Sequence, residues 1–188
     1  MWWARLLNNL AAILSDAGAA ATSYESIATV TVGAGGSSSI TFSSIPSTYK
    51  HLQIRGISRA TSTGANNLVQ FNSDTGSNYA YHTLYGDGSS AAAAAATTQT
   101  SAYAGYTAQN GSTANAFSSL IIDILDYANT NKYKTLRSLN GFDNNGSGLI
   151  VLASGLWQNT NAISTVSFAM NTGNFAQYSS FALYGVKG

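Results

Sequence analysis

Short runs in which apolar and polar residues alternate follow one another along most of this chain. Residues 28–32 and 39–42 alternate in this way on either side of a glycine-rich stretch at 33–36, which predicts a β-hairpin. The other strand-like runs lie at 49–59, 67–72, 78–85, 117–127, 133–140, 148–157, 162–170 and 177–186. We therefore predict an all-β protein of about ten strands, an antiparallel β-sandwich for which a jelly roll is the best-fitting architecture.

Two of these runs carry finer expectations. The alternation within 49–59 changes phase at Ile57, so we predict that Gly56 lies in a β-bulge. Residues 121–125 hold four aliphatic side chains that would fill both faces of a strand, as in a central buried strand.

The sequence of residues 86–115 does not predict one type of secondary structure. Six consecutive alanines at 91–96 could begin a helix, because alanine has the highest helix propensity. Serines and threonines flank them, so a strand of small residues packed at a subunit contact fits equally well. Both alternatives stay open.

The first 18 residues have a different period from the rest of the chain. Apolar residues recur there every three or four positions, and Gly18 is a suitable stop, so we predict a helix at 1–18 and a linker at 19–26 before a β module at 27–188. Arg5, Asn8 and Asn9 interrupt the apolar stretch, which is too short for a membrane span and a poor signal peptide. An apolar stripe on so short a helix favours self-association or docking on another protein, although packing against the sandwich is an alternative. The predicted anchor residues are Trp2, Trp3, Leu6, Leu7, Leu10, Ile13 and Leu14.

Composition limits the chemistry of this 188-residue chain. Only 8% of its residues are charged, against roughly 25% in a typical globular protein, so neutral hydrogen-bonding groups must cover the surface. A net charge of +1 gives no reason to expect a nucleic-acid partner. The absence of cysteine excludes thiolate catalysis and cysteine-based metal sites.

The carboxylates and histidines do not form a recognisable catalytic pattern. Asp123 and Asp126 are the closest acidic pair, but an odd separation on a strand sends side chains to opposite faces. Asp74 and Asp143 stand beside Asn, Ser and Gly and are predicted to be turn residues. We expect no catalytic, cofactor-binding or metal site, and therefore no enzyme.

Tyrosine is the one abundant residue type that could recognise a ligand. The chain has eleven tyrosines, and exposed tyrosine among Ser, Asn and Gly is typical of adaptable binding surfaces. Strand propensity and core packing explain the same residues equally well. The candidate contacts for a glycan are Tyr79, Tyr81, His82, Tyr85, Tyr103 and Tyr106.

Six short segments, taken in their order along the chain, resemble a module of tailed-bacteriophage structural proteins. They are residues 39–56, 71–82, 121–127, 132–135, 154–157 and 181–187, and together they place the resemblance over about 27–188. The resemblance implies a non-enzymatic β-sandwich component of a virion, assembled in the host cytoplasm and found in fibres, spikes or head-decorating proteins.

Three hypotheses of function follow, and the first leads. The chain is expected to be a fibre or spike protein, a homo-oligomer of three copies whose N-terminal helix contacts capsid, portal or tail proteins and whose outer face contacts a host glycan. A capsid decoration protein is the alternative role within the virion. A secreted carbohydrate-binding module is the second class, and a glycan-degrading enzyme that uses Asp123 or Asp126 is the third.

Overall fold

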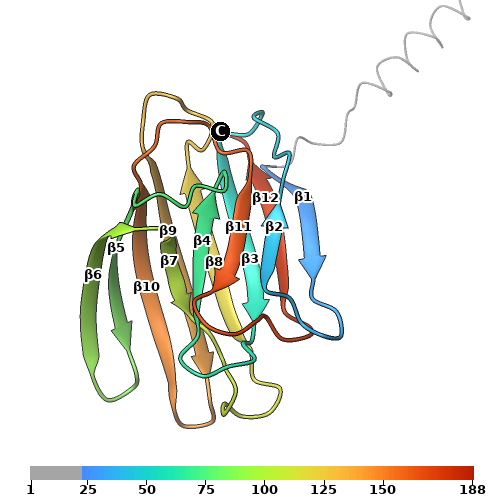
Figure 1. The fold of residues 1–188 in the computed structure, drawn as a ribbon, viewed down its shortest axis with the longest axis vertical. Helices are drawn as coiled ribbons and strands as arrows, with labels where there is room; N and C mark the ends of the chain where they lie inside the picture. Colours follow the sequence, from blue (N-terminus) through green and yellow to red (C-terminus); the bar gives the residue numbers. More distant parts are fainter. Residues whose placement is uncertain (1–22) are drawn as a thin grey trace, which may run out of the picture.

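The computed structural model describes residues 23–188, and every regular element in that range is a β-strand (Figure 1). The first six strands are β1 (Tyr24–Thr31), β2 (Ser39–Phe42), β3 (His51–Ser58), β4 (Asn66–Phe71), β5 (Tyr79–Gly86) and β6 (Ala91–Gln99). The last six are β7 (Ala102–Tyr106), β8 (Ser118–Leu125), β9 (Lys134–Asp143), β10 (Gly148–Trp157), β11 (Val166–Met170) and β12 (Ser180–Val186). The helix predicted at 1–18 lies outside the described residues. Residues 19–22 of the predicted linker also lie outside the described residues, and β1 begins at Tyr24.

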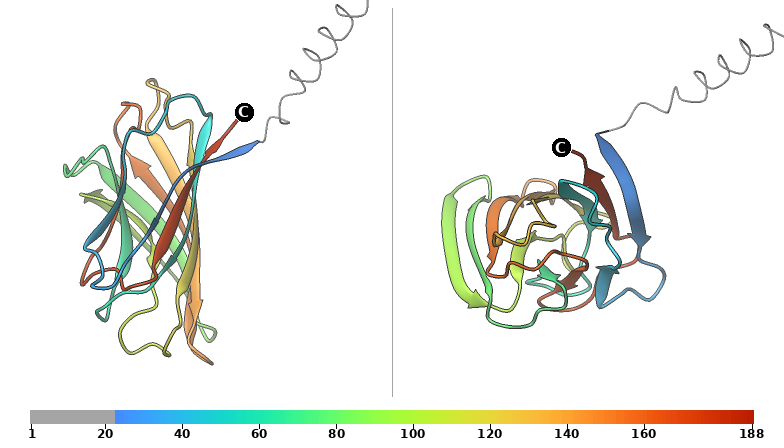
Figure 2. Two further views of the ribbon diagram at one scale, coloured as in Figure 1. Left: turned by 90° about the vertical axis from the view of Figure 1, so that its right-hand side faces the viewer. Right: turned by 90° about the horizontal axis from the view of Figure 1, so that it is seen from above.

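The strands form two antiparallel sheets that pack face to face, which confirms the predicted β-sandwich (Figure 2). The large sheet has eight strands in the order β1-β12-β3-β8-β9-β10-β5-β6. The small sheet has four, in the order β2-β11-β4-β7. Strands from the two ends of the sequence therefore lie side by side, as β1 and β12 do in Figure 1.

The hairpin predicted from residues 28–32 and 39–42 is wrong, although both strands exist. β1 pairs with β12 in the large sheet, whereas β2 pairs with β11 in the small sheet. The connection crosses from one sheet to the other, and Ser37 exchanges backbone hydrogen bonds with Phe175 on the way. Ile40 and Phe42 then face the core from the small sheet, where both are buried. A glycine-rich turn can connect two sheets as readily as two neighbouring strands, so the local pattern did not fix the pairing.

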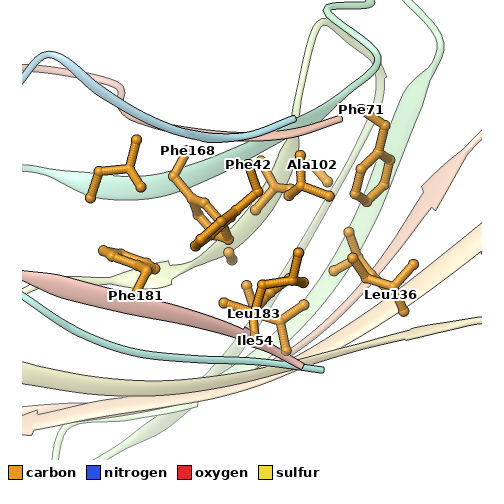
Figure 3. Packing of buried hydrophobic residues seen from close by; sticks show 14 of the residues in the cluster. Phe42, Ile54, Phe71, Ala102, Leu136, Phe168, Phe181 and Leu183 are labelled. Carbon is orange, nitrogen blue, oxygen red and sulfur yellow. The ribbon is translucent and has the colours of Figure 1, made fainter. Parts of the chain in front are cut away.

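The core lies between the sheets and is built from the inward-facing residues of both (Figure 3). Phe168 of the small sheet meets Phe181 of the large sheet with ring centroids 4.7 Å apart. Gly56 also faces inward, and a Cβ added there would lie 2.8 Å from the Phe181 ring. β3 pairs with β8 and β12 without a register shift, so the predicted bulge is absent. Ile57 simply points outward, 45% exposed.

The six alanines at 91–96 form a strand, which removes the helical alternative. The Asp87 carboxylate accepts hydrogen bonds from the backbone N–H groups of Ser89 and Ser90, and the resulting turn folds β6 back on β5. Pairing along the whole of β5 outweighs the helix propensity of alanine. β6 is the last strand of the large sheet, and together with β7 it raises the strand number of the described residues above the predicted ten.

The different widths of the two sheets position the surface features described below. β7 is the last strand of the small sheet, and it packs against β9 and β10 and touches β5. The hairpin of β5 and β6 therefore projects beyond the small sheet, at the left of Figure 1.

Candidate functional site

The structure divides the six candidate glycan contacts among three places. Tyr81, Tyr85, Tyr103 and Tyr106 gather in a cleft between β5 and the end of the small sheet. Tyr79 belongs to the core and His82 to the opposite face of the large sheet. The predicted anchor residues at positions 2–14 lie outside the described residues.

Alternation along β5 explains this division. Successive side chains of a strand point to opposite faces, so residues 79, 81, 83 and 85 face the small sheet. His82 and Leu84 face outward and are exposed. The prediction treated residues 79–85 as one aromatic surface and missed this separation.

Tyr79 is fully buried and cannot contact a surface ligand, so its assignment is corrected. Its ring is nearly parallel to that of Trp157, with centroids 6.3 Å apart and an interplanar angle of 19°. Its hydroxyl accepts a hydrogen bond of 2.9 Å from the backbone N–H of Phe71. Burial raises the pKa of Tyr79 to about 12, so the hydroxyl stays protonated. Tyr79 stabilises the sandwich.

The other four tyrosines form a continuous aromatic cluster, which we call the tyrosine cleft. The ring centroids of Tyr81 and Tyr103 are 5.3 Å apart, those of Tyr103 and Tyr106 are 5.9 Å apart, and those of Tyr85 and Tyr106 are 6.1 Å apart. Tyr103 is only 8% exposed and forms the floor, while the other three are half-buried. Burial raises the pKa of Tyr103. The cleft encloses about 350 Å³.

Neutral polar groups complete the lining of the tyrosine cleft. Asn66 and Asn171 stand at one side, and the 99–101 connection between β6 and β7 stands at another. The backbone N–H of Asn66 donates a hydrogen bond of 2.6 Å to the side-chain oxygen of Asn171. The Oδ1 atom of Asn66 is buried and has no hydrogen-bond partner among the described residues. No charged side chain from residues 23–188 lines the cleft.

A second surface lies on the outer face of the large sheet, and we call it the apolar row. Its members are directly paired on neighbouring strands. From β8 to β6 the row reads Ile121, Leu139, Leu152, Leu84 and Ala93, and the charged Arg55 of β3 stands at its end. Leu84, Leu139 and Leu152 are 50% to 55% exposed. A shallow hollow of about 860 Å³ is lined by Leu152, Leu84, Ala93 and Leu125 and also by the more polar Arg137, Ser154 and His82.

The row beside the apolar row is polar and contains both signs of charge. Asp123 accepts hydrogen bonds from Arg137 at 3.1 Å and from Gln53 at 2.9 Å. Ser154 and His82 continue this row across β10 and β5. The prediction that residues 121–125 would be buried on both faces is wrong, since Ile121 and Leu125 belong to the exposed face.

The remaining carboxylates have structural partners. Asp126 lies in the turn after β8, where Lys132 at 2.6 Å and Lys50 at 2.9 Å lower its pKa to about 2. Asp123 and Asp126 bind different cations, and Asp126 follows the end of β8, so strand alternation does not apply to it. Among residues 23–188, no three His, Asp or Glu residues stand close enough to hold a metal ion. The same residues contain no helix that is long and apolar enough to cross a membrane.

Comparisons of the sequence with protein-family models and with curated proteins gave no match. The tyrosine cleft, the apolar row and the composition are therefore the features from which a function can be inferred. Sequence reasoning found the tyrosines but missed Asn66 and Asn171, which lie far apart in the sequence. It also missed the apolar row, although the alternation of β9 and β10 is a signal that could have shown leucines on both faces.

Proposed function

We propose that this chain is a non-enzymatic structural protein of a tailed-phage particle, of the fibre or spike type. The β-sandwich would be the displayed module, and residues 1–18 would attach it to capsid, portal or tail proteins. The resemblance of residues 27–188 to phage structural modules supports this role. The chain has few charged residues, and Asp74, Asp123 and Asp126 are each bonded to a side chain of the fold. Both observations favour a structural role over a catalytic one.

The strand order supports a jelly roll as the finer description of the fold. Without the hairpins β5–β6 and β9–β10, the sheets would be β1-β12-β3-β8 and β2-β11-β4-β7. Eight strands divided equally in this way are typical of jelly rolls, which recur in viral capsid domains. Both hairpins are additions to one side of the large sheet.

The apolar row is the observation that carries the proposal of an assembly role. Three leucines side by side on a sheet face, each at least half exposed, are unusual on a protein that works as a monomer. We propose that a neighbouring copy of this chain covers them in a closed assembly of three. The flanking Asp123 and Arg137 balance each other's charge, so this pair adds no net charge at the edge of the row.

The location of the chain in purified particles tests this function. We expect antibodies against residues 27–188 to label the tail or its fibres by electron microscopy, with a few tens of copies at most per particle. Hundreds of copies spread over the head would instead identify a capsid decoration protein. Absence from the particle would overturn both virion roles and leave the secreted carbohydrate-binding module.

A truncation tests the attachment role separately. A variant that begins at residue 19 is expected to retain the strand signal in circular dichroism, because the described strands pair and pack with one another. It should fail to enter particles during assembly. Normal incorporation of the truncated chain would contradict an anchor at 1–18.

A further inference from the structure

We propose that the tyrosine cleft is a binding site for a neutral saccharide. This inference deepens the proposed display function, because it names the class of ligand that the displayed module would recognise. It rests on the geometry of residues 66–106 and 171.

The aromatic part of the cleft can stack against sugar rings. Tyr81 and Tyr85 come from the large sheet, and Tyr103 and Tyr106 come from the small sheet, so rings approach from two sides. Tyr81, Tyr85 and Tyr106 are only half-buried, which leaves part of each ring available. The hollow of about 350 Å³ is near the lower end of the ~300–1,000 Å³ typical of small-molecule sites.

The polar part of the cleft matches a ligand that carries hydroxyl groups. Asn66 Oδ1 is a buried acceptor without a partner among the described residues, and an unpaired buried acceptor is costly. The atom is covered in the ligand-free chain, so a sugar hydroxyl would satisfy it after the Asn66 side chain turns toward the cleft. The amide of Asn171 is already bonded to Asn66 and Gly64, and the NH2 group of Gln99 to Thr97. The side-chain oxygen of Gln99 and the hydroxyls of Thr100 and Ser101 add neutral acceptors and donors to the lining. A purely apolar ligand would take these groups from water without replacing their hydrogen bonds.

The absence of charge from the lining selects neutral sugars over acidic ones. In the part of the chain that the structure describes, no Lys, Arg or His lines the cleft, so a carboxylate or phosphate on the ligand would lose its hydration without gaining a cation. His82 is the one basic side chain on β5, and it points to the other face of the sheet. Burial also keeps Tyr103 protonated, so its hydroxyl remains a donor.

The test is a binding measurement on the purified full chain, by saturation-transfer NMR and calorimetry. The probes are lactose and chitotriose as neutral saccharides, with 3′-sialyllactose as the acidic counterpart of lactose. We expect at least one neutral probe to bind at millimolar concentration or below, and sialyllactose to bind no better than lactose. No binding of either neutral probe, or a preference for sialyllactose over lactose, would overturn the proposal.

Variants localise the site. Tyr81→Ala should weaken binding at least tenfold, whereas Tyr133→Ala, which removes a 54% exposed tyrosine outside the cleft, should leave it unchanged. Asn66→Ala should weaken binding while the unfolding midpoint stays equal or rises, because the lost Oδ1 atom has no partner within residues 23–188. Equal losses for Tyr81→Ala and Tyr133→Ala, or unchanged binding by Asn66→Ala, would contradict a site in the cleft.

The binding measurement uses isolated protein, so it is independent of where the chain lies in a particle. A failure to bind saccharide would not contradict a location in the particle, and absence from the particle would not contradict the saccharide site.

Discussion

Asp74 shows how a single side chain joins distant parts of this fold. Its carboxylate accepts a hydrogen bond of 2.7 Å from the indole N–H of Trp157, 83 residues along the chain. The same carboxylate accepts bonds from the backbone N–H of Gly76 at 2.8 Å and from the side chain of Asn78 at 2.9 Å. These bonds, chiefly that from Trp157, hold the pKa of Asp74 below its ordinary value. The carboxylate thus satisfies a polar group of the buried tryptophan next to Tyr79.

Replacement of Asp74 by alanine should destabilise the protein by about 1–3 kcal/mol, because the Trp157 N–H would lose its acceptor in the core. Urea unfolding at neutral pH measures the loss. Thr75→Ala, an exposed neighbour in the same turn, is the control and should change little. A loss from Thr75→Ala as large as that from Asp74→Ala would contradict this explanation.

The lowered pKa of Asp74 also gives a pH dependence. The folded protein holds the ionised form more strongly than the unfolded chain does, so this stabilisation is complete above the ordinary carboxyl pKa of about 3.9. It is lost as the pH falls below that value. The stability difference between the native chain and Asp74→Asn should therefore shrink on acidification, as acid and urea titrations of both proteins would show. A difference that stays constant down to pH values at which the native chain unfolds would rule out this linkage.

At the residue scale, the sequence predicted the local role of Asp74 but not the distant one. The cluster of Asn, Ser, Asp and Gly around Asp74 predicted a turn, and the structure has one, with the Asp74 N–H bonded to the Phe71 carbonyl. Turn chemistry acts between neighbours and is visible in a short stretch. The partner Trp157 depends on sheet packing, which no short stretch encodes. The tyrosines were found for a similar reason, whereas their separation into core, cleft and outer face depended on strand register.

At the scale of the element, strand positions were predictable and strand partners were not. β10 matches its predicted range of 148–157, because alternation is a property of the strand itself. β1 and β2 were placed correctly but assigned to each other, and the crossing between sheets was missed. In β6 the propensity of six alanines left two structures open, and pairing with β5 decided between them.

β3 provides a test of how tightly the elements pack. Gly56→Ala should lower the free energy of unfolding by about 1–3 kcal/mol, because the added methyl group would push against Phe181 at 2.8 Å. Gly33→Ala is the matched control, since an added Cβ there meets no atom within 4 Å. Chemical denaturation of both variants measures the difference. If both lose the same stability, glycine at position 56 is not required by the core.

At the scale of the whole molecule, the two faces of the large sheet differ in what covers them. The inner face holds the core, and the outer face holds the apolar row, whose exposure requires an explanation beyond the stability of the single chain. The proposed assembly of three copies provides one.

Leu152→Lys tests that assembly, because it places a charge in the middle of the apolar row. Sedimentation of the native full chain should show a trimer, and the variant should sediment as a monomer with an unchanged strand signal. Tyr178→Lys is the control, since Tyr178 is 68% exposed and lies just before β12, four strands from the row's centre on β10. A monomeric native chain, or a Leu152→Lys variant that remains trimeric, would show that the row is not the contact between copies.

The placement of β11 and β12 also governs when the protein can fold during its synthesis. β12 lies between β1 and β3, and β11 lies between β2 and β4, so each sheet needs a late strand in its interior. Until residues 166–186 have left the ribosome, β1 and β2 have no strand to pair with. Their apolar side chains therefore stay exposed to solvent until then. The two layers can close only after β11 and β12 have been made, and long-range pairing of this type makes that closure slow.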